Sequence, residues 1–208
     1  MDNIIIKTPD EELYEAVQDL LHKDFRKRER MNVSSGSPAD AENATSPYRD
    51  WLEEGFSLVA IDSQKDIVVG AAVNYTVSRS DQHEITSSMP IRKRFFLTIM
   101  EELKQGFDIF EELDTDKGME LCLLSVKEDY SGMGIGRRLT EETIQLARNR
   151  EMKFIQSVPT AAATRHIFQA LGFETRREKK FQEFSFEGLP AFPLANPDDI
   201  ARYVVKKL

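Results

Sequence analysis

Three glycines stand at alternate positions between an apolar run and a helical pattern. Gly132, Gly134 and Gly136 lie in the stretch "LSVKEDYSGMGIGRRL". Glycine lets backbone N–H groups converge on an anion, and the N-terminus of the following helix adds partial positive charge. Arg137 and Arg138 would oppose the helix dipole in that first turn, but they would suit a bound phosphate. The spacing predicts a phosphate-binding turn; a tight turn without a ligand is the alternative.

Two common nucleotide-binding motifs do not describe this turn. A Walker loop requires GxxxxGK[ST], which the sequence lacks. A Rossmann fingerprint requires GxGxxG and an acidic residue at the end of the next strand. Here Arg137 stands three positions after Gly134, and the stretch "KFIQSVP" ends without an acid. A phosphate bound at this turn would therefore be held by a different kind of site.

The segments around the turn predict one α/β or α+β domain with a mixed central sheet. Periodicity and boundary residues predict helices over residues 9–29, 48–55, 90–113 with a break at Gly106, 134–150 and 161–172. Composition predicts strands over residues 56–62 and 66–78, joined as a hairpin, and over 119–126, 153–159 and 179–187. Residues 31–50 are rich in Ser, Asn, Ala and Pro and predict a long irregular loop. A strand, glycine turn, helix and strand in that order form a βαβ unit with a parallel pair.

The composition of the whole chain excludes several classes of partner. At 208 residues the chain is expected to form a single domain, 1–208. Its net charge of −8 argues against nucleic acid, and apolar runs such as "IVVGAAV" are far too short to cross a bilayer. An acidic N-terminus that is no signal peptide and one cysteine, Cys122, fit a cytoplasmic protein. The three histidines stand apart, so no metal site is expected.

The segment "LLSVKEDYSGMGIGRRLTEETIQLA" resembles the acyl-CoA signature of the GNAT family of N-acetyltransferases. That signature is Arg or Gln, two residues, Gly, one residue, and Gly or Ala after a hydrophobic strand. It falls on Ser131, Gly134 and Gly136, and the departure at Ser131 removes the usual side chain but not the backbone amides. "RHIFQALGFE" resembles the end of the family's closing helix. The resemblance implies the GNAT fold, a mixed sheet of about seven strands flanked by helices and splayed at the acetyl-CoA site.

The resemblance also implies which residues contact acetyl-CoA, the cosubstrate of the family. The N–H and C=O groups of Leu124 and Val126 would polarise the thioester carbonyl and hold the pantetheine arm. Phe168 stands where many members carry a tyrosine that protonates the leaving thiolate, and it has no proton to give. The residues expected to hold the pyrophosphate are Ser131, Gly132, Met133, Gly134, Ile135, Gly136 and Arg137.

A narrower resemblance is to insect arylalkylamine N-acetyltransferases, which carry a "DEPLN" segment after the first helix. "KRERMN" is similar to it, with Glu29 at the catalytic glutamate and Asn32 at the asparagine, although Arg28 and Arg30 replace Asp and Pro. The same group has two serines before the last helix, and Thr160 and Thr164 stand at the corresponding positions. The resemblance implies Glu29 as general base, and a solvated charge in the run "RKRER" is the alternative for this residue. The threonines are expected to be proton relays or, alternatively, helix caps.

The implied function is direct acetyl transfer from acetyl-CoA to the primary amine of a small molecule in a ternary complex. Arylalkylamines such as tyramine, dopamine and serotonin are the first candidates. Polyamines or agmatine, and protein amines, are alternatives, as is a CoA-binding module that has lost catalysis. The loop from Asn32 to Asp50 is expected to cover a small-molecule pocket, and the protein is expected to be a monomer or weak dimer.

Overall fold

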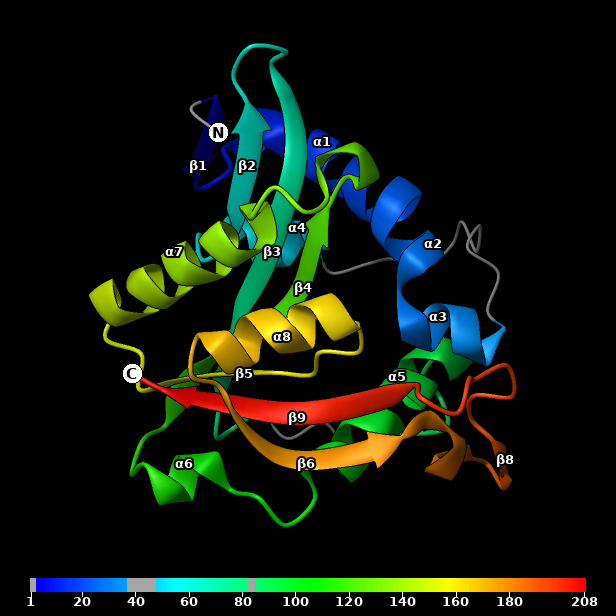
Figure 1. Ribbon diagram of the computed structural model, residues 1–208. Helices are drawn as coiled ribbons and strands as arrows, with labels where there is room; N and C mark the ends of the chain where they lie inside the picture. The colour runs from blue at the N-terminus through cyan, green and yellow to red at the C-terminus, as the bar shows by residue number, and fades with distance from the viewer. Residues whose placement is uncertain (1–2, 37–47, 82–84) are drawn as a thin grey trace.

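A mixed sheet forms the centre of the molecule. The computed structural model describes residues 3–36, 48–81 and 85–208, and within them seven strands pair in the order β1-β2-β3-β4-β5-β9-β6 (Figure 1). β4 and β5 are parallel, and all other neighbours are antiparallel. The bounds are β1 Ile4–Lys7, β2 Leu58–Asp62, β3 Ile67–Ser78, β4 Lys117–Val126, β5 Phe154–Ser157, β6 Glu174–Lys180 and β9 Ile200–Lys207. The mixed α/β class, the β2–β3 hairpin and the parallel pair are confirmed.

Helices cover both faces of this sheet (Figure 1). α7 and α8 lie on one face, and α1, α4 and α5 lie on the other. Near the N-terminus they are α1 Glu11–Leu20, the π-helical turn η1 Leu21–Phe25, α2 Arg26–Arg28, α3 Arg30–Ser35 and α4 Tyr48–Glu53. Further along they are α5 Ile91–Lys104, α6 Ile109–Glu112, η2 Glu128–Tyr130, α7 Ile135–Asn149, α8 Ala162–Ala170 and η3 Phe181–Glu183. A short hairpin of β7 Ser185–Phe186 and β8 Leu189–Pro190 follows η3.

The β2–β3 hairpin is apolar on both faces because each face has its own helices. Ala60 of β2 belongs to the same buried cluster as Leu139 of α7, whereas its neighbour Val59 belongs to the cluster that contains Leu20 of α1. Successive strand residues point to opposite faces, so a strand buried on both sides reads as a continuous hydrophobic run. This explains the continuous apolar stretch "IVVGAAV" in β3.

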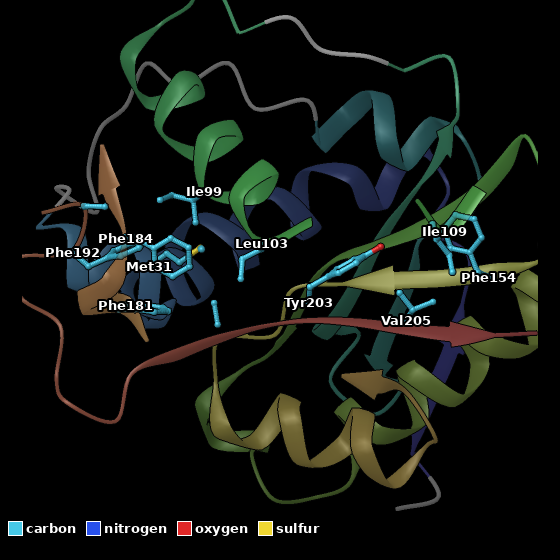
Figure 2. Packing of buried hydrophobic residues seen from close by; sticks show 12 residues of the cluster. Met31, Ile99, Leu103, Ile109, Phe154, Phe181, Phe184, Phe192, Tyr203 and Val205 are labelled. Carbon is cyan, nitrogen blue, oxygen red and sulfur yellow. The ribbon is translucent and has the colours of Figure 1, made fainter. Parts of the chain in front are cut away.

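A third cluster fixes α3 against the C-terminal part of the chain. Figure 2 shows Phe181, Phe184 and Phe192, from the segment after β6, gathered beside Met31 of α3. The rings of Phe181 and Phe192 stack with centroids 4.5 Å apart. Buried aromatic side chains contribute large apolar areas to a core. The start of α3, immediately after Glu29, is therefore anchored by residues that are far away in the sequence.

β4 and β5 pair only at the start and then separate. Their register joins Met119 to Ile155 and Glu120 to Gln156. On its other side, β4 has a bulge opposite Val73 and Asn74, because these pair with Leu123 and Leu121 and leave Cys122 as the extra residue. A bulge bends the strand that carries it and increases its twist. The bulge therefore lies where β4 turns away from β5, and this separation is the expected splay.

Two sequence-based predictions require correction, and β1 was not predicted. The strand predicted over 179–187 is wrong: β6 occupies Glu174–Lys180, and Phe181 begins a 3-10 turn that buries it. β6 is an edge strand rich in charged residues, which is typical of edges protected against pairing and hides the apolar alternation. The loop predicted over 31–50 is also wrong at its ends, which form α3 and the start of α4, and residues 37–47 lie outside the described part of the chain. β9 escaped prediction altogether.

Candidate active site

The glycine turn lies between β4 and α7 and exposes backbone. Gly132 and Gly134 have φ values of 77° and 74°, in the left-handed region, and Gly134 is the N-cap of α7. The first N–H groups of an α-helix have no partner inside the helix, so those that follow Gly134 are available to a ligand. A Cβ built on Gly134 would meet no protein atom within 4 Å, so the space above the turn is open. The turn has the geometry of an anion site.

The side chains around the turn divide into core and surface. Ile135 is buried between α7 and the sheet. Arg137 forms an exposed ion pair with Glu141 at 2.9 Å and lines the cavity described below. Arg138 instead donates to the carbonyl oxygen of Ile4 in β1 at 3.2 Å, so its guanidinium is committed to the sheet edge. The anion site therefore depends on backbone amides, with Arg137 as the nearby cation.

The outer edge of β4 presents peptide groups to the gap left by β5. Lys127 donates from its backbone N–H to the carbonyl of Val69 in β3 at 2.8 Å. Because antiparallel pairs alternate in direction, the peptide groups of Leu124 and Val126 point away from β3 and into the gap. Arg28 contacts one of these groups directly, since its Nη2 donates to the carbonyl of Val126 at 2.7 Å. The peptide groups of Leu124 and Val126 therefore face the gap between β4 and β5.

Glu29 is held between α2 and α3 and faces the loop after β5. Its carboxylate caps α3 by accepting from the backbone N–H groups of Met31 at 2.9 Å and Asn32 at 2.8 Å. The hydroxyl of Thr160 also donates to it, at 3.0 Å. Burial raises the pKa of the Glu29 carboxyl above its ordinary value, although these three hydrogen bonds oppose the shift. One carboxylate thus both caps a helix and faces the cavity.

The remaining predicted residues lie on or behind the wall formed by α8. Thr160 precedes α8 and Thr164 lies in its first turn, and both line the cavity. Phe168 also borders the cavity, but its side chain is only 1% exposed and stacks on Phe173 with centroids 4.6 Å apart. Phe168 therefore packs mainly in the core behind the site. Met133 differs from the other predicted residues, because it is 40% exposed and is not among those that line the cavity.

One cavity of about 2000 Å³ joins these features to a second region on the other face of the sheet. There Trp51 of α4 stacks on Tyr75 of β3 with ring centroids 4.5 Å apart and planes 16° apart. Glu120 of β4 and Lys104 of α5 line the same region and form an ion pair at 2.9 Å. Sequence reasoning missed these four residues. The single tryptophan was a possible signal, but the pairing of Tyr75 with Glu120 depends on strand register, which the sequence does not display.

The donor set of the cavity fits coenzyme A. The glycine turn offers unpaired amides to a pyrophosphate, and the gap beside β4 offers peptide groups to an extended amide-containing arm. Within residues 3–36, 48–81 and 85–208, no group of three or more His, Cys, Asp or Glu side chains is arranged to hold a metal ion. In the same part of the chain, no helix combines the length and apolar character needed to cross a membrane.

Comparison with known proteins agrees with this geometry. Residues 92–175 match the family model of the acetyltransferase (GNAT) domain. The fold is similar to arylalkylamine N-acetyltransferase 2 from Aedes aegypti, with a TM-score of 0.87, 22% identity and 99% of each chain covered. It is also similar to an agmatine N-acetyltransferase (TM-score 0.88, 17% identity, 100% of each chain covered). A polyamine N-acetyltransferase from Drosophila melanogaster that forms N-acetylagmatine has a TM-score of 0.85 and 16% identity, with 99% of this chain and 100% of that chain covered.

These findings define the class of the protein. The fold is that of the GNAT acetyltransferases, including the parallel β4–β5 splay. Residues 92–175 match the acetyltransferase (GNAT) domain, and this match indicates acyl transfer with acetyl-CoA as the cosubstrate.

Proposed function

We propose that this protein acetylates the primary amine of a small arylalkylamine, by direct transfer within a ternary complex, with Glu29 as general base. One observation carries the proposal. The Glu29 carboxylate, whose pKa is raised, lies against Thr160 in the same cavity as the glycine turn and the open edge of β4. An anion site, a polarising strand edge and a base in one cavity are the parts that acetyl transfer needs.

The cofactor side of the site works through the backbone. Bound acetyl-CoA would supply a thioester-activated acetyl group. The amides around Gly134 would hold its pyrophosphate, and the peptide groups of Leu124 and Val126 would bind the arm and donate to the carbonyl oxygen as negative charge develops there. Arg28 contacts the Val126 carbonyl, so its guanidinium lies at this edge of the site.

Glu29 addresses the protonation of the acceptor. An alkylammonium has a pKa of about 10.4, so the amine must lose a proton before it can attack. A buried carboxylate with a raised pKa is a better base than an exposed one, and it can act directly or through an ordered water. The raised pKa of Glu29 therefore suits the base role while its hydrogen bonds hold it in place.

The leaving thiolate needs little help. A thiol has a pKa of about 8.5, so the thiolate can leave without full protonation. Phe168 offers no proton, but the hydroxyls of Thr160 and Thr164 line the cavity and could relay one. The hydrogen bond from Thr160 to Glu29 connects this relay to the base. The proton taken from the amine could thus return to the thiolate through Thr160.

An arylalkylamine suits the acceptor side because its wall is aromatic. Trp51 and Tyr75 form a stacked pair, and Tyr48 lies at a tilt beside Trp51 with centroids 5.9 Å apart. All three line the cavity. Such faces favour an aromatic ring and can also attract a cation. Agmatine or a polyamine is the second candidate, favoured by the acceptors of two structurally similar enzymes.

The test is thiol release from acetyl-CoA over a panel of tyramine, dopamine, serotonin, agmatine, spermidine and a lysine peptide. We expect the aromatic amines to react with the highest kcat/KM. Calorimetric titration with acetyl-CoA serves as the control for an intact cofactor site. Binding without turnover on any amine would replace the proposal with a CoA-binding module, and turnover of the peptide alone would make the protein a protein acetyltransferase.

A further inference from the structure

Glu120 is a buried carboxylate at the point where β4 and β5 begin to separate. It is 5% exposed, and its register partner across the parallel pair is Gln156, the last such pair before the gap. Gln156 donates from Nε2 to Glu120 Oε2 at 2.7 Å, and the Tyr203 hydroxyl donates to Gln156 Oε1 at 2.8 Å. Figure 2 shows Tyr203 reaching in from β9. The orientation of Glu120 is therefore fixed by a buried network.

One oxygen of this carboxylate is left for a ligand. Lys104 Nζ also donates to Oε2, at 2.9 Å, so both protein donors share one oxygen. Among the hydrogen bonds between described residues, none uses Oε1, and Glu120 lines the cavity. A buried carboxylate gains from filling its acceptor sites, because an unsatisfied polar group costs free energy. The cavity thus contains a strong hydrogen-bond acceptor that the protein itself leaves open.

Glu120 lies at a suitable distance from the base. Glu29 contacts Thr160 and Glu120 contacts Gln156, and these two contact residues are four positions apart in the chain, so at most roughly 13 Å separates them. Tyr75 pairs with Glu120 in the β3–β4 register, which places the Trp51–Tyr75 aromatic pair alongside this path. A phenylethylamine with a hydrogen bond at each end matches this span. Its ring would lie along the aromatic wall.

We infer that the Glu120–Lys104 pair selects the far end of the acceptor, accepting a hydrogen bond from a ring hydroxyl and rejecting a second cation. The inference rests on the proposed function and adds a specificity site to it. A phenolic hydroxyl can donate to Glu120 Oε1 without bringing charge into the cavity. A guanidinium or second ammonium would meet a carboxylate that Lys104 has already neutralised and would be repelled by the Lys104 ammonium.

The experiment compares kcat/KM for tyramine, phenethylamine, which lacks the hydroxyl, and agmatine, which carries a second cation. We expect the wild-type protein to prefer tyramine over phenethylamine by about 10- to 100-fold, the range that a hydrogen bond to a charged group supplies. Glu120→Gln should bring that ratio close to one. Lys104→Met should raise the agmatine-to-tyramine ratio about tenfold, because it leaves the carboxylate uncompensated. Glu142→Gln, on the exposed face of α7, is the matched control and should change neither ratio.

The outcomes separate this inference from the function on which it rests. If phenethylamine and tyramine react equally well in the wild-type protein, the specificity site is refuted and the acetyltransferase remains. A preference for tyramine that persists in Glu120→Gln also refutes it. If acetyl-CoA binds and no amine reacts, the proposed function fails and the inference fails with it. If Glu120→Gln does not fold, two measurements still test the inference: the tyramine-to-phenethylamine ratio of the wild-type protein and the agmatine-to-tyramine ratio of Lys104→Met.

Discussion

The two halves of the cavity offer different kinds of chemical group to a ligand. On the proposed cofactor side, the groups offered to a ligand are backbone: the amides after Gly134 and the peptide groups of Leu124 and Val126. On the acceptor side, they come from side chains of elements far apart in sequence, such as Trp51 with Tyr75 and Lys104 with Glu120. Ligand binding through backbone groups depends on local conformation. Ligand binding through side chains depends on how distant elements of the chain pack together.

This difference explains how substitution should act on each half. Most side chains of the cofactor half can change without loss, provided the backbone keeps its path. The acceptor half is expected to tolerate fewer changes, because Glu29 and Glu120 are each held by a partner from another element. The predictions below test this contrast, beginning with the largest effect.

Glu29→Gln should reduce kcat by roughly 10²- to 10⁴-fold, the usual contribution of a general base. The substitution preserves shape, so acetyl-CoA affinity should stay within about twofold, because the backbone half is untouched. Stopped-flow thiol release and calorimetric titration measure the two quantities. Unchanged turnover would remove Glu29 from the mechanism.

Gly134→Val should raise the Kd for acetyl-CoA by about 100-fold, because a branched side chain would occupy the open space over the turn and strain a positive φ. Gly188→Val is the control, since Gly188 also has a positive φ and open space but lies in the β7–β8 turn. Titration of both variants separates strain from blocked binding. Normal acetyl-CoA affinity in Gly134→Val would contradict the backbone site.

Asp199→Asn should lower the free energy of unfolding by about 1–3 kcal/mol, because it leaves Arg30 of α3 without its carboxylate. Asp199 is 11% exposed on its side chain and pairs with Arg30 at 2.6 Å. Burial raises the pKa of Asp199, but the hydrogen bonds from Arg30, the Asn196 backbone N–H and Ser34, together with the charge of Arg30, outweigh burial and lower the net pKa. The bridge therefore stabilises the fold above the unfolded pKa of about 3.9 and is lost as pH falls through the lower folded value.

Denaturant unfolding at neutral and acidic pH tests this stability prediction. The difference between the wild-type protein and Asp199→Asn should shrink as the medium becomes acidic. Asp198→Asn, the exposed neighbour, should match the wild-type protein throughout. A constant difference at all pH values would mean that charge is not what Asp199 contributes.

Thr160→Val should move the acidic limb of the pH profile of kcat/KM to higher pH. The Thr160 hydrogen bond lowers the pKa of Glu29, so its removal lets burial raise that pKa further. The base form, which exists above the pKa, would then appear only in more alkaline medium. Rates measured across pH for the variant and for Thr160→Ser, which keeps the hydroxyl, check the effect. If the acidic limb did not move, Thr160 would have no influence on the pKa of the group that acts as base.

The same contrast determined what could be predicted from the sequence. The glycine turn, the strand before it and helix α7 were predictable because their signal is local: glycine spacing, an apolar run and helical periodicity. Trp51, Tyr75, Lys104 and Glu120 could not be, because strand register and helix packing bring them together. β6 was predicted at the wrong residues because its charged side chains hide the alternation of apolar and polar residues. Glu29 was identified only through the resemblance to a known family.

The π-helical turn Leu21–Phe25 has a consequence for how Glu29 is aimed. A π turn holds one more residue than an α turn, so everything after it is rotated by about 100° relative to an uninterrupted α-helix. Arg28 and Glu29 follow it and reach β4 and Thr160, respectively. A chain shortened by one residue in this turn could keep the same helix and the same amino acids beyond it, yet present a different face to the sheet. In this protein, the direction in which Glu29 points depends on the number of residues in the turn as much as on their types.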